Sequence, residues 1–508
     1  MEFEQRKTTV LMFPWLAHGH ISPFLELAKT LSRRNFMVYL CSTRDNLGCI
    51  RRRISDSHVS SCIQLIELHV PALPGLPPNC HTTKNLPPHL MPTLKKAFDQ
   101  SVKGFSDLLK ALKPDLLLYD TIQPWAPSVA SRLGIPAVAF VSTSATMTSL
   151  MLHRHRDSGK EFPFPKIHLH DFEDEKLDHL LQSSENYYNQ KNRFVECLEQ
   201  SSGIILIKSS RKIEGKYIDY LSVLSEKKIV PVGPLVLQPS ANEPHRSSIL
   251  QWLDKREHSS TVFVSFGSEY FLTIAEMEEM AHGLELSGVN FIWVIRFPAG
   301  VKSRVEEALP QGFLEKVSGR GLVVENWAPQ VQILEHPNTG GFVSHCGWSS
   351  MMEGIHYGVP IIAIPMHLDQ PVNARLLQDV GAGVEVKRDE NGSLFREEIA
   401  RVVKEVVEKE TGEAVKKKQI ELGDAIRMEE QEVVDGLVDE LLQLCLKNNK
   451  NMMMMMKQKK KTKKDTDPWF DALYFGDWWH YLTNIFTFHR KEQQDGLNME
   501  IEVEMRSS

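Results

Sequence analysis

The chain has 508 residues and a formal net charge of -6, with 42% apolar and 24% charged residues. One hydrophobic core seldom serves a chain of this length, so the length predicts two domains. A mildly acidic, mixed composition argues against a nucleic-acid partner. The sequence contains no run of about 18 apolar residues, so we expect no stable membrane insertion.

The seven cysteines are scattered along the chain and form no C-x-x-C pair. An odd, scattered set argues against a disulfide framework or a structural zinc site, and it favours a reducing compartment. The first 20 residues carry acids ahead of a short apolar run that His and Pro soon interrupt, which is unlike a secretory signal. We therefore expect a cytoplasmic protein.

In chain order, short apolar segments alternate with longer amphipathic stretches such as residues 23–35. This alternation predicts a parallel sheet whose crossovers are helices. The segments that read as buried strands of the first half are 9–14, 37–41, 63–68, 115–120, 137–141 and 203–207.

A second series begins after residue 260, again with intervening helices such as 273–288. Its predicted strands are 262–266, 291–295, 322–324, 341–344, 361–364 and 383–386. The fold class is therefore α/β, with two Rossmann-like domains facing each other across a cleft. Ligands of such sheets bind beyond the carboxyl ends of the strands, so the chemistry is expected in the strand-to-helix loops of both halves.

The polar, proline-containing segment 236–248 is the best candidate for the linker between the two domains. We expect an N-terminal domain over 1–240 and a C-terminal domain over 241–446, whose last helix packs back on the first.

The tail over 447–508 has a different composition, with five consecutive Met, six Lys in eight residues and then an aromatic patch at 467–488. A low-complexity, solvated tail is favoured over a nuclear address or a patch for anionic surfaces. Whether the aromatic patch packs as a small appendage or stays unfolded is left open.

The first loop runs from a strand through a tight turn into a helix, with His18 and His20 in the turn. We expect Gly19 to permit the turn and Pro23 to lie in the first helical turn. Either histidine suits proton abstraction near neutral pH. Asp120, at the end of another strand, could orient a histidine and stabilise its imidazolium, or it could simply cap the following helix.

The richest segment is 327–370, in which a strand and a glycine-containing turn lead into a helix. His345, Ser349 and Ser350 fall near the start of that helix, where backbone N–H groups attract phosphate. A carboxylate one turn later, Glu353, suits ribose hydroxyls. Taken alone, each residue also fits an ordinary structural role, and the His-Cys pair lacks a second ligand pair at metal spacing.

Three further side chains of this segment fit the remaining parts of a nucleotide sugar. Trp327 offers a flat face for a base. Asp369 and Gln370 together supply several acceptors and an amide donor, which suits a polyhydroxylated ring. Trp327 and the neighbouring Trp348 are also the kind of residue that packs in a core.

The segment resembles the signature box of the plant UDP-dependent glycosyltransferases. The motifs W-A-P-Q, G-G-F-V-S-H-C-G-W, E-G, G-V-P and D-Q all fall at the spacing of that family. The chain up to about residue 445 is similar to the family as well, including "GHISPFLELAK" and "VFVSFGS". One departure is Ser349, since the family usually has Asn after H-C-G-W.

The resemblance implies a GT-B fold, with the acceptor held by the N-terminal domain and no metal or permanently bound cofactor. It makes His20, not His18, the catalytic base and Asp120 its partner. It implies that the donor is UDP-glucose, since Gln370 is usual in glucose users. The implied donor contacts are Trp327, Ala328 and Gln330 at the base and ribose, Glu353 at the ribose, Ser268, His345, Ser349 and Ser350 at the diphosphate, and Trp348, Asp369 and Gln370 at the sugar.

The resemblance further implies an inverting transfer, in which His20 deprotonates an acceptor hydroxyl as it attacks C1 of the sugar. Several segments look most like the branch-forming subgroup, which extends the sugar of a flavonoid, terpenoid or apocarotenoid glucoside. The alternatives are an aglycone O-glucosyltransferase acting on a flavonoid or cytokinin, or the use of UDP-rhamnose or UDP-xylose.

Two alternative functions, from other classes of protein, are disfavoured. A Rossmann oxidoreductase lacks its G-x-G-x-x-G turn after the first strand. A non-catalytic binder of UDP-sugars would have no need of both His20 and Asp120. We expect a monomer whose partners are a UDP-sugar and a small-molecule glycoside.

Overall fold

The computed structural model describes residues 6–54, 60–84, 86–157, 159–182, 190–237, 248–268, 270–297 and 304–463. Residues Met1–Leu446 form one compact unit, and Lys447–Ser508 form a separate one. The following paragraphs concern the first unit. The linker predicted from the sequence lies largely outside the described residues, as do residues 464–508 of the tail.

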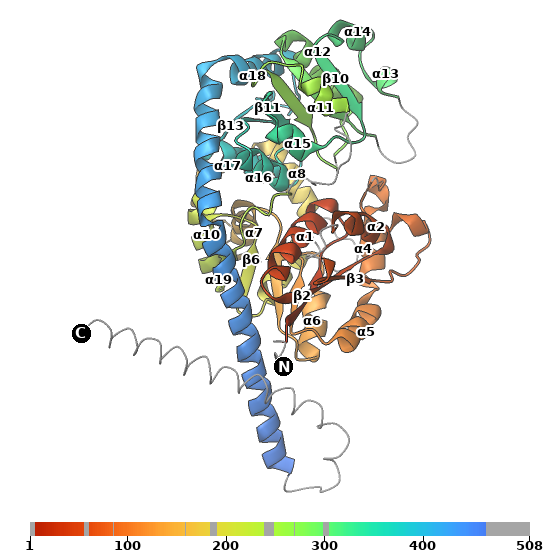
Figure 1. Ribbon diagram of the computed structural model, residues 1–508, viewed down its shortest axis with the longest axis vertical. Helices are drawn as coiled ribbons and strands as arrows, with labels where there is room; N and C mark the ends of the chain where they lie inside the picture. Colours follow the sequence, from red (N-terminus) through yellow and green to blue (C-terminus); the bar gives the residue numbers. More distant parts are fainter. Residues whose placement is uncertain are drawn as a thin grey trace, which may run out of the picture. The chain divides into compact units, whose positions relative to one another are not determined.

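The first unit contains two parallel sheets that alternate with helices (Figure 1). The seven strands of the first sheet follow the order β3-β2-β1-β4-β5-β6-β7, and every neighbouring pair is parallel. These strands are β1 (Thr8–Phe13), β2 (Phe36–Ser42), β3 (Ile63–Glu67), β4 (Leu116–Tyr119), β5 (Ala137–Val141), β6 (Ile204–Ile207) and β7 (Lys228–Pro231).

The second sheet has six parallel strands in the order β10-β9-β8-β11-β12-β13. This order repeats the pattern of the first sheet. In both sheets the first strand lies near the middle, the next two strands are added on one side of it, and the later strands are added on the other side. The strands are β8 (Thr261–Ser265), β9 (Asn290–Ile295), β10 (Gly321–Glu325), β11 (Thr339–Ser344), β12 (Ile361–Ala363) and β13 (Gly383–Glu385). The predicted fold of two Rossmann-like domains is confirmed.

Helices follow most strands, as right-handed crossovers between parallel strands require. In the first domain they are α1 (His18–Ser32), α2 (Arg44–Arg53), α4 (Met91–Asp99), α5 (Val102–Leu112), α6 (Trp125–Arg132), α7 (Ala145–Arg156), α8 (Asp171–Gln182), α9 (Gln190–Glu199) and α10 (Arg211–Ser225), with 3₁₀ turns η1 (Pro78–Cys80) and η2 (Pro88–Leu90). In the second they are α11 (Ser248–Leu253), α12 (Ile274–Ser287), α13 (Val305–Ala308), α14 (Phe313–Val317), α15 (Gln330–Glu335), α16 (Trp348–His356), α17 (Gln370–Asp379) and α18 (Arg396–Glu408), before α19 (Glu410–Lys463).

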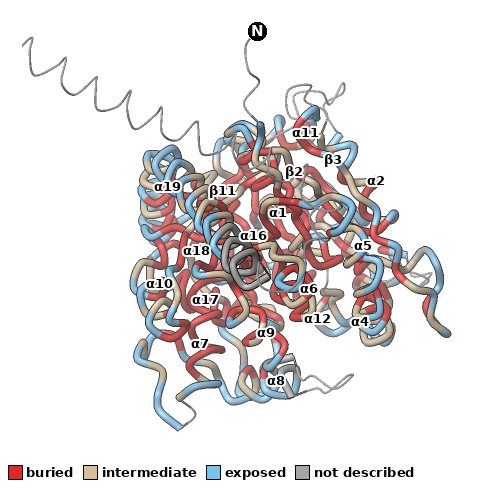
Figure 2. Tube along the Cα trace, turned by 90° about the horizontal axis from the view of Figure 1, so that it is seen from below, coloured by how far each residue is buried: buried red, intermediate tan, exposed pale blue. Residues whose placement is uncertain are grey.

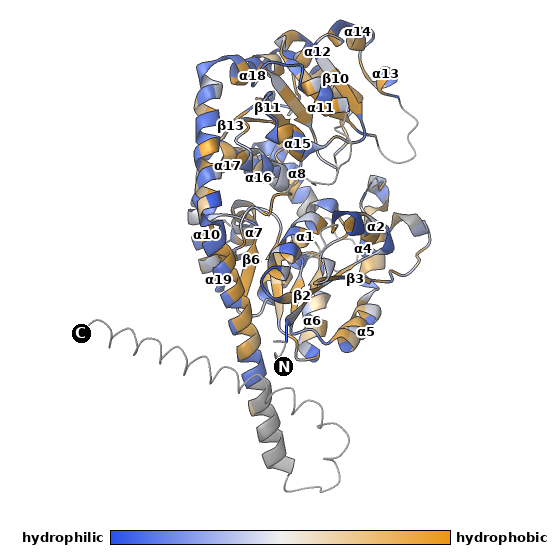
Figure 3. Ribbon diagram, viewed as in Figure 1, coloured by the Kyte–Doolittle hydropathy of each residue, from blue (hydrophilic) through white to orange (hydrophobic). Residues whose placement is uncertain are grey.

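The central strands are apolar on both faces, because helices cover both sides of each sheet. Val10 to Phe13 of β1 are fully buried, and so are Phe291, Ile292 and Trp293 of β9. Figure 2 shows this buried interior beneath a partly exposed outer layer, and Figure 3 shows the apolar colouring of the central strands. The sheets are therefore rigid supports, and their strand-end loops hold the polar side chains.

Helix α19 begins in the second domain and returns to the first sheet. Leu437, Leu441 and Cys445 form one buried stripe along it, spaced four residues apart. They pack in the same apolar cluster as Val10 of β1 and Leu118 of β4. The helix continues to Lys463, so residues 447–463 are helical where the sequence predicts a low-complexity tail.

Two local predictions from the sequence were wrong. Helix α1 already begins at His18, because the carbonyl of Ala17 accepts from the N–H groups of His20 (3.0 Å) and Ile21 (2.9 Å). Gly19 therefore lies in the first turn of the helix and not in a tight turn before it, and Pro23 lies in the second turn.

Strand β7 was not predicted, since a four-residue edge segment with a terminal proline gives little signal.

Candidate active site

The strand order reverses between β1 and β4 in the first sheet and between β8 and β11 in the second. In open parallel sheets the loops at such a reversal diverge to opposite faces and leave a crevice. His20 and Asp120 follow β1 and β4, whereas Ser268 and His345 follow β8 and β11. Residues predicted from the sequence thus stand at the reversal point of each sheet.

His20 and Asp120 are in direct contact. The Nδ1 atom of His20 lies 2.8 Å from Oδ2 of Asp120, and the hydroxyl of Ser142 lies 3.1 Å from the same nitrogen. Asp120 is fully buried, while 28% of the His20 side chain is exposed. A buried carboxylate bonded to one ring nitrogen fixes the orientation of the imidazole and stabilises its protonated form.

The geometry of Asp120 does not fit the alternative role of a helix cap. Helix α6 begins only at Trp125, and Pro124 precedes it. The carboxylate instead accepts from the backbone N–H groups of Trp15 (3.0 Å) and Thr121 (2.7 Å). These bonds hold Asp120 in place at the crevice with one oxygen turned to His20.

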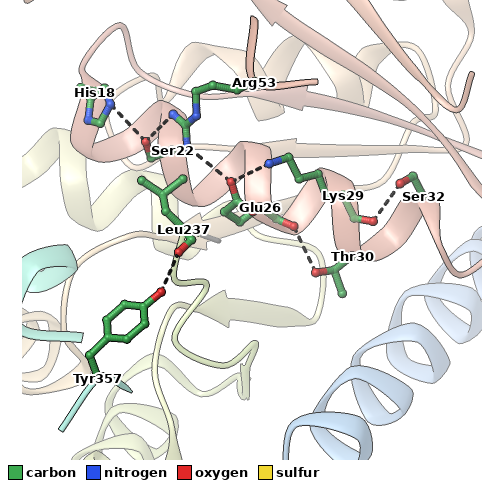
Figure 4. Close-up of polar contacts among 9 residues, drawn as sticks. All are labelled: His18, Ser22, Glu26, Lys29, Thr30, Ser32, Arg53, Leu237 and Tyr357. Atoms are coloured by element: carbon green, nitrogen blue, oxygen red, sulfur yellow. Dashed lines mark hydrogen bonds and ion pairs between the residues drawn. The ribbon is translucent and has the colours of Figure 1, made fainter. Parts of the chain in front are cut away.

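His18 has different surroundings, although it lies two residues from His20. Its Nε2 atom is 3.4 Å from the hydroxyl of Ser22, which accepts from Arg53 at 2.9 Å (Figure 4). Arg53 and Lys29 both pair with Glu26 at the far side of this cluster. Crowding by the surrounding side chains, followed by the charge of Arg53, lowers the pKa of His18, although the residue reaches the surface. The cluster holds His18 beside a guanidinium, so it is poorly suited to receive a proton.

The loop after β5 in the first domain forms hydrogen bonds with the second domain. The sequence analysis did not single out its residues. Ser142, beside His20, is followed by Thr143, whose hydroxyl donates to Asp369 at 2.7 Å. Ser144 donates to Asn373 of α17 at 2.7 Å, and Asn373 in turn donates to Asp369 at 3.0 Å. Their position at the carboxyl edge of β5 is the signal that could have singled them out.

His345 is enclosed by two glycines. A β-carbon on Gly267 or Gly347 would stand 2.6 Å from the His345 ring, so both positions require glycine. The intervening Cys346 adopts a left-handed conformation with φ of +60°, which turns the chain from β11 into α16. Burial, followed by the nearby His367, lowers the pKa of His345 to about 3. This ring is therefore neutral at ordinary pH and acts as a hydrogen-bonding group without a charge.

The residues predicted at the base and ribose lie together. Gln330 donates to Glu353 at 2.6 Å and to the Ser350 hydroxyl at 3.3 Å. Burial raises the pKa of Glu353, although the bond from Gln330 opposes this shift. Trp327 is 66% exposed, which leaves its ring face accessible, whereas Ala328 is buried beside it. An exposed indole that follows β10 and a buried carboxylate in α16, both at the carboxyl edge of the second sheet, suit a base and its ribose.

Two residues predicted at the sugar make other contacts in the structure. The indole N–H of the buried Trp348 donates to the carbonyl of Lys208 at 2.6 Å. The side-chain oxygen of Gln370 accepts from the N–H groups of Met366 (3.0 Å) and His367 (3.1 Å). Both side chains therefore support the loops around the crevice, and a bound sugar would have to compete for the Gln370 amide.

Lys208 was also missed in the sequence. It follows β6 of the first sheet, is only 2% exposed, and donates from Nζ to the hydroxyl of Ser349 at 2.7 Å. Ser349, where the family that this segment resembles usually has Asn, thus contacts a buried ammonium group from the other domain.

Within the described residues, no group of three or more His, Cys, Asp or Glu is placed to hold a metal ion. None of the described helices combines the length and the apolar character needed to cross a membrane.

Comparisons with known proteins match both halves of the chain to family models. Residues 231–424 match the family described as UDP-glucoronosyl and UDP-glucosyl transferase. Residues 6–237 match the family described as Glycosyltransferase, N-terminal domain. The two models meet between the two sheets.

Similar proteins of known activity cover most of the chain. Mogroside IIIx synthase of Siraitia grosvenorii is 52% identical over 85% of this chain and 96% of its own length. Beta-D-glucosyl crocetin beta-1,6-glucosyltransferase of Gardenia jasminoides is 49% identical over 87% of this chain and 100% of its own length. The crystal structure of UGT73P12 of Glycyrrhiza uralensis shares the fold, with a TM-score of 0.78 and 24% identity over 90% of this chain and 100% of that one.

Proposed function

Because this chain belongs to the UDP-glycosyltransferase family, we propose that it transfers glucose from UDP-glucose, with inversion, to a sugar hydroxyl of a small-molecule glucoside. The name of the Gardenia relative describes such a sugar-on-sugar reaction, since its acceptor is a glucosyl crocetin. The identity of 49% over nearly the whole chain supports the same class of acceptor here.

One observation carries the proposal: of two consecutive residues, one contacts the proposed base, His20, and the other contacts Asp369 in the proposed donor loop. Ser142 lies against Nδ1 of His20, and Thr143 donates to Asp369. Asp369 is the carboxylate expected to bind sugar hydroxyls. An acceptor hydroxyl at His20 would therefore stand close to the sugar that it attacks, which is the proximity that group transfer requires.

The proposed reaction uses His20 as a general base. Since Nδ1 faces Asp120, the ring nitrogen that takes the proton is Nε2. The acceptor oxygen loses its proton as it bonds to C1 of glucose, and the bond from C1 to the UDP oxygen breaks on the opposite face. The buried carboxylate of Asp120 stabilises the imidazolium formed in this step.

The donor is proposed to lie along the loops of the second sheet. Trp327 stacks on the base, Ala328 and Gln330 hold the base and ribose, and Glu353 binds ribose hydroxyls. The first turn of α16, with Ser349 and Ser350, faces the diphosphate together with His345 and Ser268, because N–H groups at a helix start attract anions. Asp369 and Gln370 are proposed to select glucose, with Trp348 supporting that loop.

The decisive experiment compares a flavonoid or terpenoid aglycone with its glucoside, each with UDP-glucose, and identifies the products by mass spectrometry. We expect a second hexose on the glucoside and little transfer to the aglycone. The anomeric coupling in the NMR spectrum of the product should show a β linkage. Transfer to the aglycone alone would refute the branching acceptor and support the aglycone O-glucosyltransferase alternative, on a flavonoid or cytokinin. Assays with UDP-rhamnose and UDP-xylose test the other donors.

We also propose that the enzyme is a cytosolic monomer that requires no metal. In the part of the chain that the structure describes, no disulfide joins any of the seven cysteines, which fits a reducing compartment. The helix start at α16 and its hydroxyl groups provide donors for the diphosphate without a cation cofactor. Activity that persists in EDTA, a single monomeric peak on size exclusion and cytosolic fluorescence of a fusion protein are the expected results.

A further inference from the structure

Lys208 lies at the carboxyl edge of β6, in the first domain, and its side chain extends to the start of α16 in the second. Its Nζ donates to Ser349 Oγ at 2.7 Å, and its backbone oxygen accepts from the Trp348 indole at 2.6 Å. The residue is 2% exposed. Both contacts fix the ammonium beside the first turn of α16.

This buried ammonium has an incomplete set of partners. A lysine has three N–H donors, yet within the described part of the chain its one hydrogen-bonded side chain is the neutral Ser349 hydroxyl. Glu353 and Glu26 are near enough to favour its charged form, but neither makes an ion pair with it. A buried charge is costly unless an anion accompanies it. The position therefore suits a ligand that brings negative charge.

The residues expected around the diphosphate are all uncharged: Ser268, Ser349 and Ser350 are hydroxyls, and His345 is neutral. The first turn of α16 adds N–H groups that have no carbonyl partner within the helix. Two phosphate groups would thus meet hydrogen-bond donors from these residues but no full positive charge.

We infer that Lys208 is a donor-binding residue, whose ammonium contacts the diphosphate of the UDP-sugar from the side of the acceptor domain. This inference rests on the proposed function. Ser349 has a shorter side chain than the Asn that is usual at this position, and its hydroxyl accepts from the ammonium at 2.7 Å. The inference therefore makes Ser349 a residue that holds Lys208 at the start of α16.

The same contact makes Lys208 sensitive to the leaving group. When the bond to the sugar breaks, the electron pair stays on the diphosphate oxygen, and negative charge on UDP increases. An ammonium held in a desolvated site stabilises that charge more than it stabilises the bound donor. Its loss should therefore lower kcat as well as donor affinity.

The test measures binding of UDP and of uridine to the full-length protein by titration calorimetry. For Lys208→Met we expect UDP affinity to fall at least about tenfold, since hydrogen bonds to charged groups are worth that much or more, while uridine affinity stays within about twofold. Lys208→Arg should keep most of the preference for UDP. Lys110→Met, at an exposed lysine of α5, is the matched control.

A purely structural role for Lys208 would weaken UDP and uridine equally, and that result would overturn the inference. Lys208→Gln keeps a donor and loses the charge, so it serves as the second variant if Lys208→Met does not fold, as judged from its melting curve. An unchanged ratio of UDP to uridine affinity in Lys208→Gln would equally overturn it. Wild-type protein that bound UDP but glucosylated no glycoside would refute the proposed acceptor and leave the Lys208 inference standing. Wild-type protein that bound neither ligand would overturn both.

Discussion

The two sheets each place a histidine where their strand order reverses, and the two rings have opposite electrostatic surroundings. His20 contacts the buried carboxylate of Asp120, whereas His345 is enclosed between Gly267 and Gly347, and none of the described carboxylates bonds to it. A carboxylate beside an imidazole favours its protonated form, whereas burial lowers the pKa of His345 to about 3. Under the proposed mechanism, the same residue type at the same place in the topology acts as a base in one domain and as an uncharged hydrogen-bonding group in the other.

The comparison also shows how charge is divided between the domains. The proposed catalytic pair, His20 and Asp120, follows strands of the first sheet, and most of the proposed diphosphate contacts of the second are neutral hydrogen-bonding groups. Lys208, a cation that contacts the start of α16, comes from the first domain. In the proposed site, both domains therefore contribute to donor binding.

The largest expected effect comes from removing the base. His20→Ala should lower kcat about 10²- to 10⁴-fold, which is the usual range for a positioned general base. UDP affinity should stay within about twofold, because the ring stands on the opposite domain from the donor loops. Steady-state rates and calorimetry with UDP measure the two quantities.

His18→Ala is the matched comparison for this variant, since the ring of His18 lies beside Ser22 and Arg53 and bonds to no carboxylate among the described residues. We expect a change in kcat of less than about tenfold. A variant of His20 that turned over at nearly the normal rate would remove the distinction between the two histidines.

A smaller effect is expected at the base of the nucleotide. Trp327→Ala should weaken UDP and uridine alike by about 10- to 100-fold, because stacking of a base on an aromatic ring is worth about 1–3 kcal/mol. The ring is 66% exposed, so the melting temperature should hardly change. An equal loss of UDP and uridine affinity would distinguish the role of Trp327 from that of Lys208, whose loss should weaken the binding of UDP alone. A loss confined to UDP would contradict the stacking role.

The enclosure of His345 can be tested by adding one methyl group. In Gly347→Ala the new β-carbon would stand 2.6 Å from His345 Nε2, so the ring must move. Overpacking of this kind costs about 1–3 kcal/mol, and we expect the KM for the UDP-sugar to rise about tenfold.

Gly48→Ala in α2 is the control, because nothing lies within 4 Å of its added β-carbon. It should leave KM unchanged and raise the melting temperature slightly, since alanine favours a helix more than glycine. Equal KM values for the two variants would show that the position of His345 has no bearing on donor binding.

The smallest expected effect is on pH dependence. Burial lowers the pKa of Lys208 to about 8, while Glu353 of α16 and Glu26 of α1 oppose the shift. The charged form is thus nearly complete well below pH 8, about half present near pH 8 and lost as the pH rises further. UDP affinity should fall a few-fold between about pH 7.5 and 9, and that of uridine should not. Lys208→Met should abolish this difference between UDP and uridine. A wild-type UDP affinity that does not change over this pH range would contradict the prediction.

Most of the strands could be predicted because each is a short apolar run between polar loops. All six strands of the second sheet and six of the seven in the first follow such runs, and β7 was missed because it is short and lies at an edge. The contact of His20 with Asp120 could be predicted, since the two residues follow neighbouring central strands of one parallel sheet. The start of α1 was not, because the capping carbonyl of Ala17 gives no signal in the sequence.

The residues missed in the sequence share one physical property. Ser142, Thr143 and Lys208 lie in short polar segments at the carboxyl ends of β5 and β6, and their partners come from elements far along the chain. A serine, threonine or lysine after a strand suggests no particular chemistry. Its role follows only from the distant residue that it contacts in the folded chain.

The return of α19 to the first sheet has a consequence for synthesis. The cluster that contains Val10 and Leu118 is completed by Leu437, Leu441 and Cys445, which leave the ribosome after nearly every other residue of that unit. During synthesis, part of the apolar surface of the first domain therefore stays exposed until the second domain and α19 have also been translated. A fragment that ends at residue 240 should be prone to aggregation, and adding the peptide 430–446 in trans should restore its solubility.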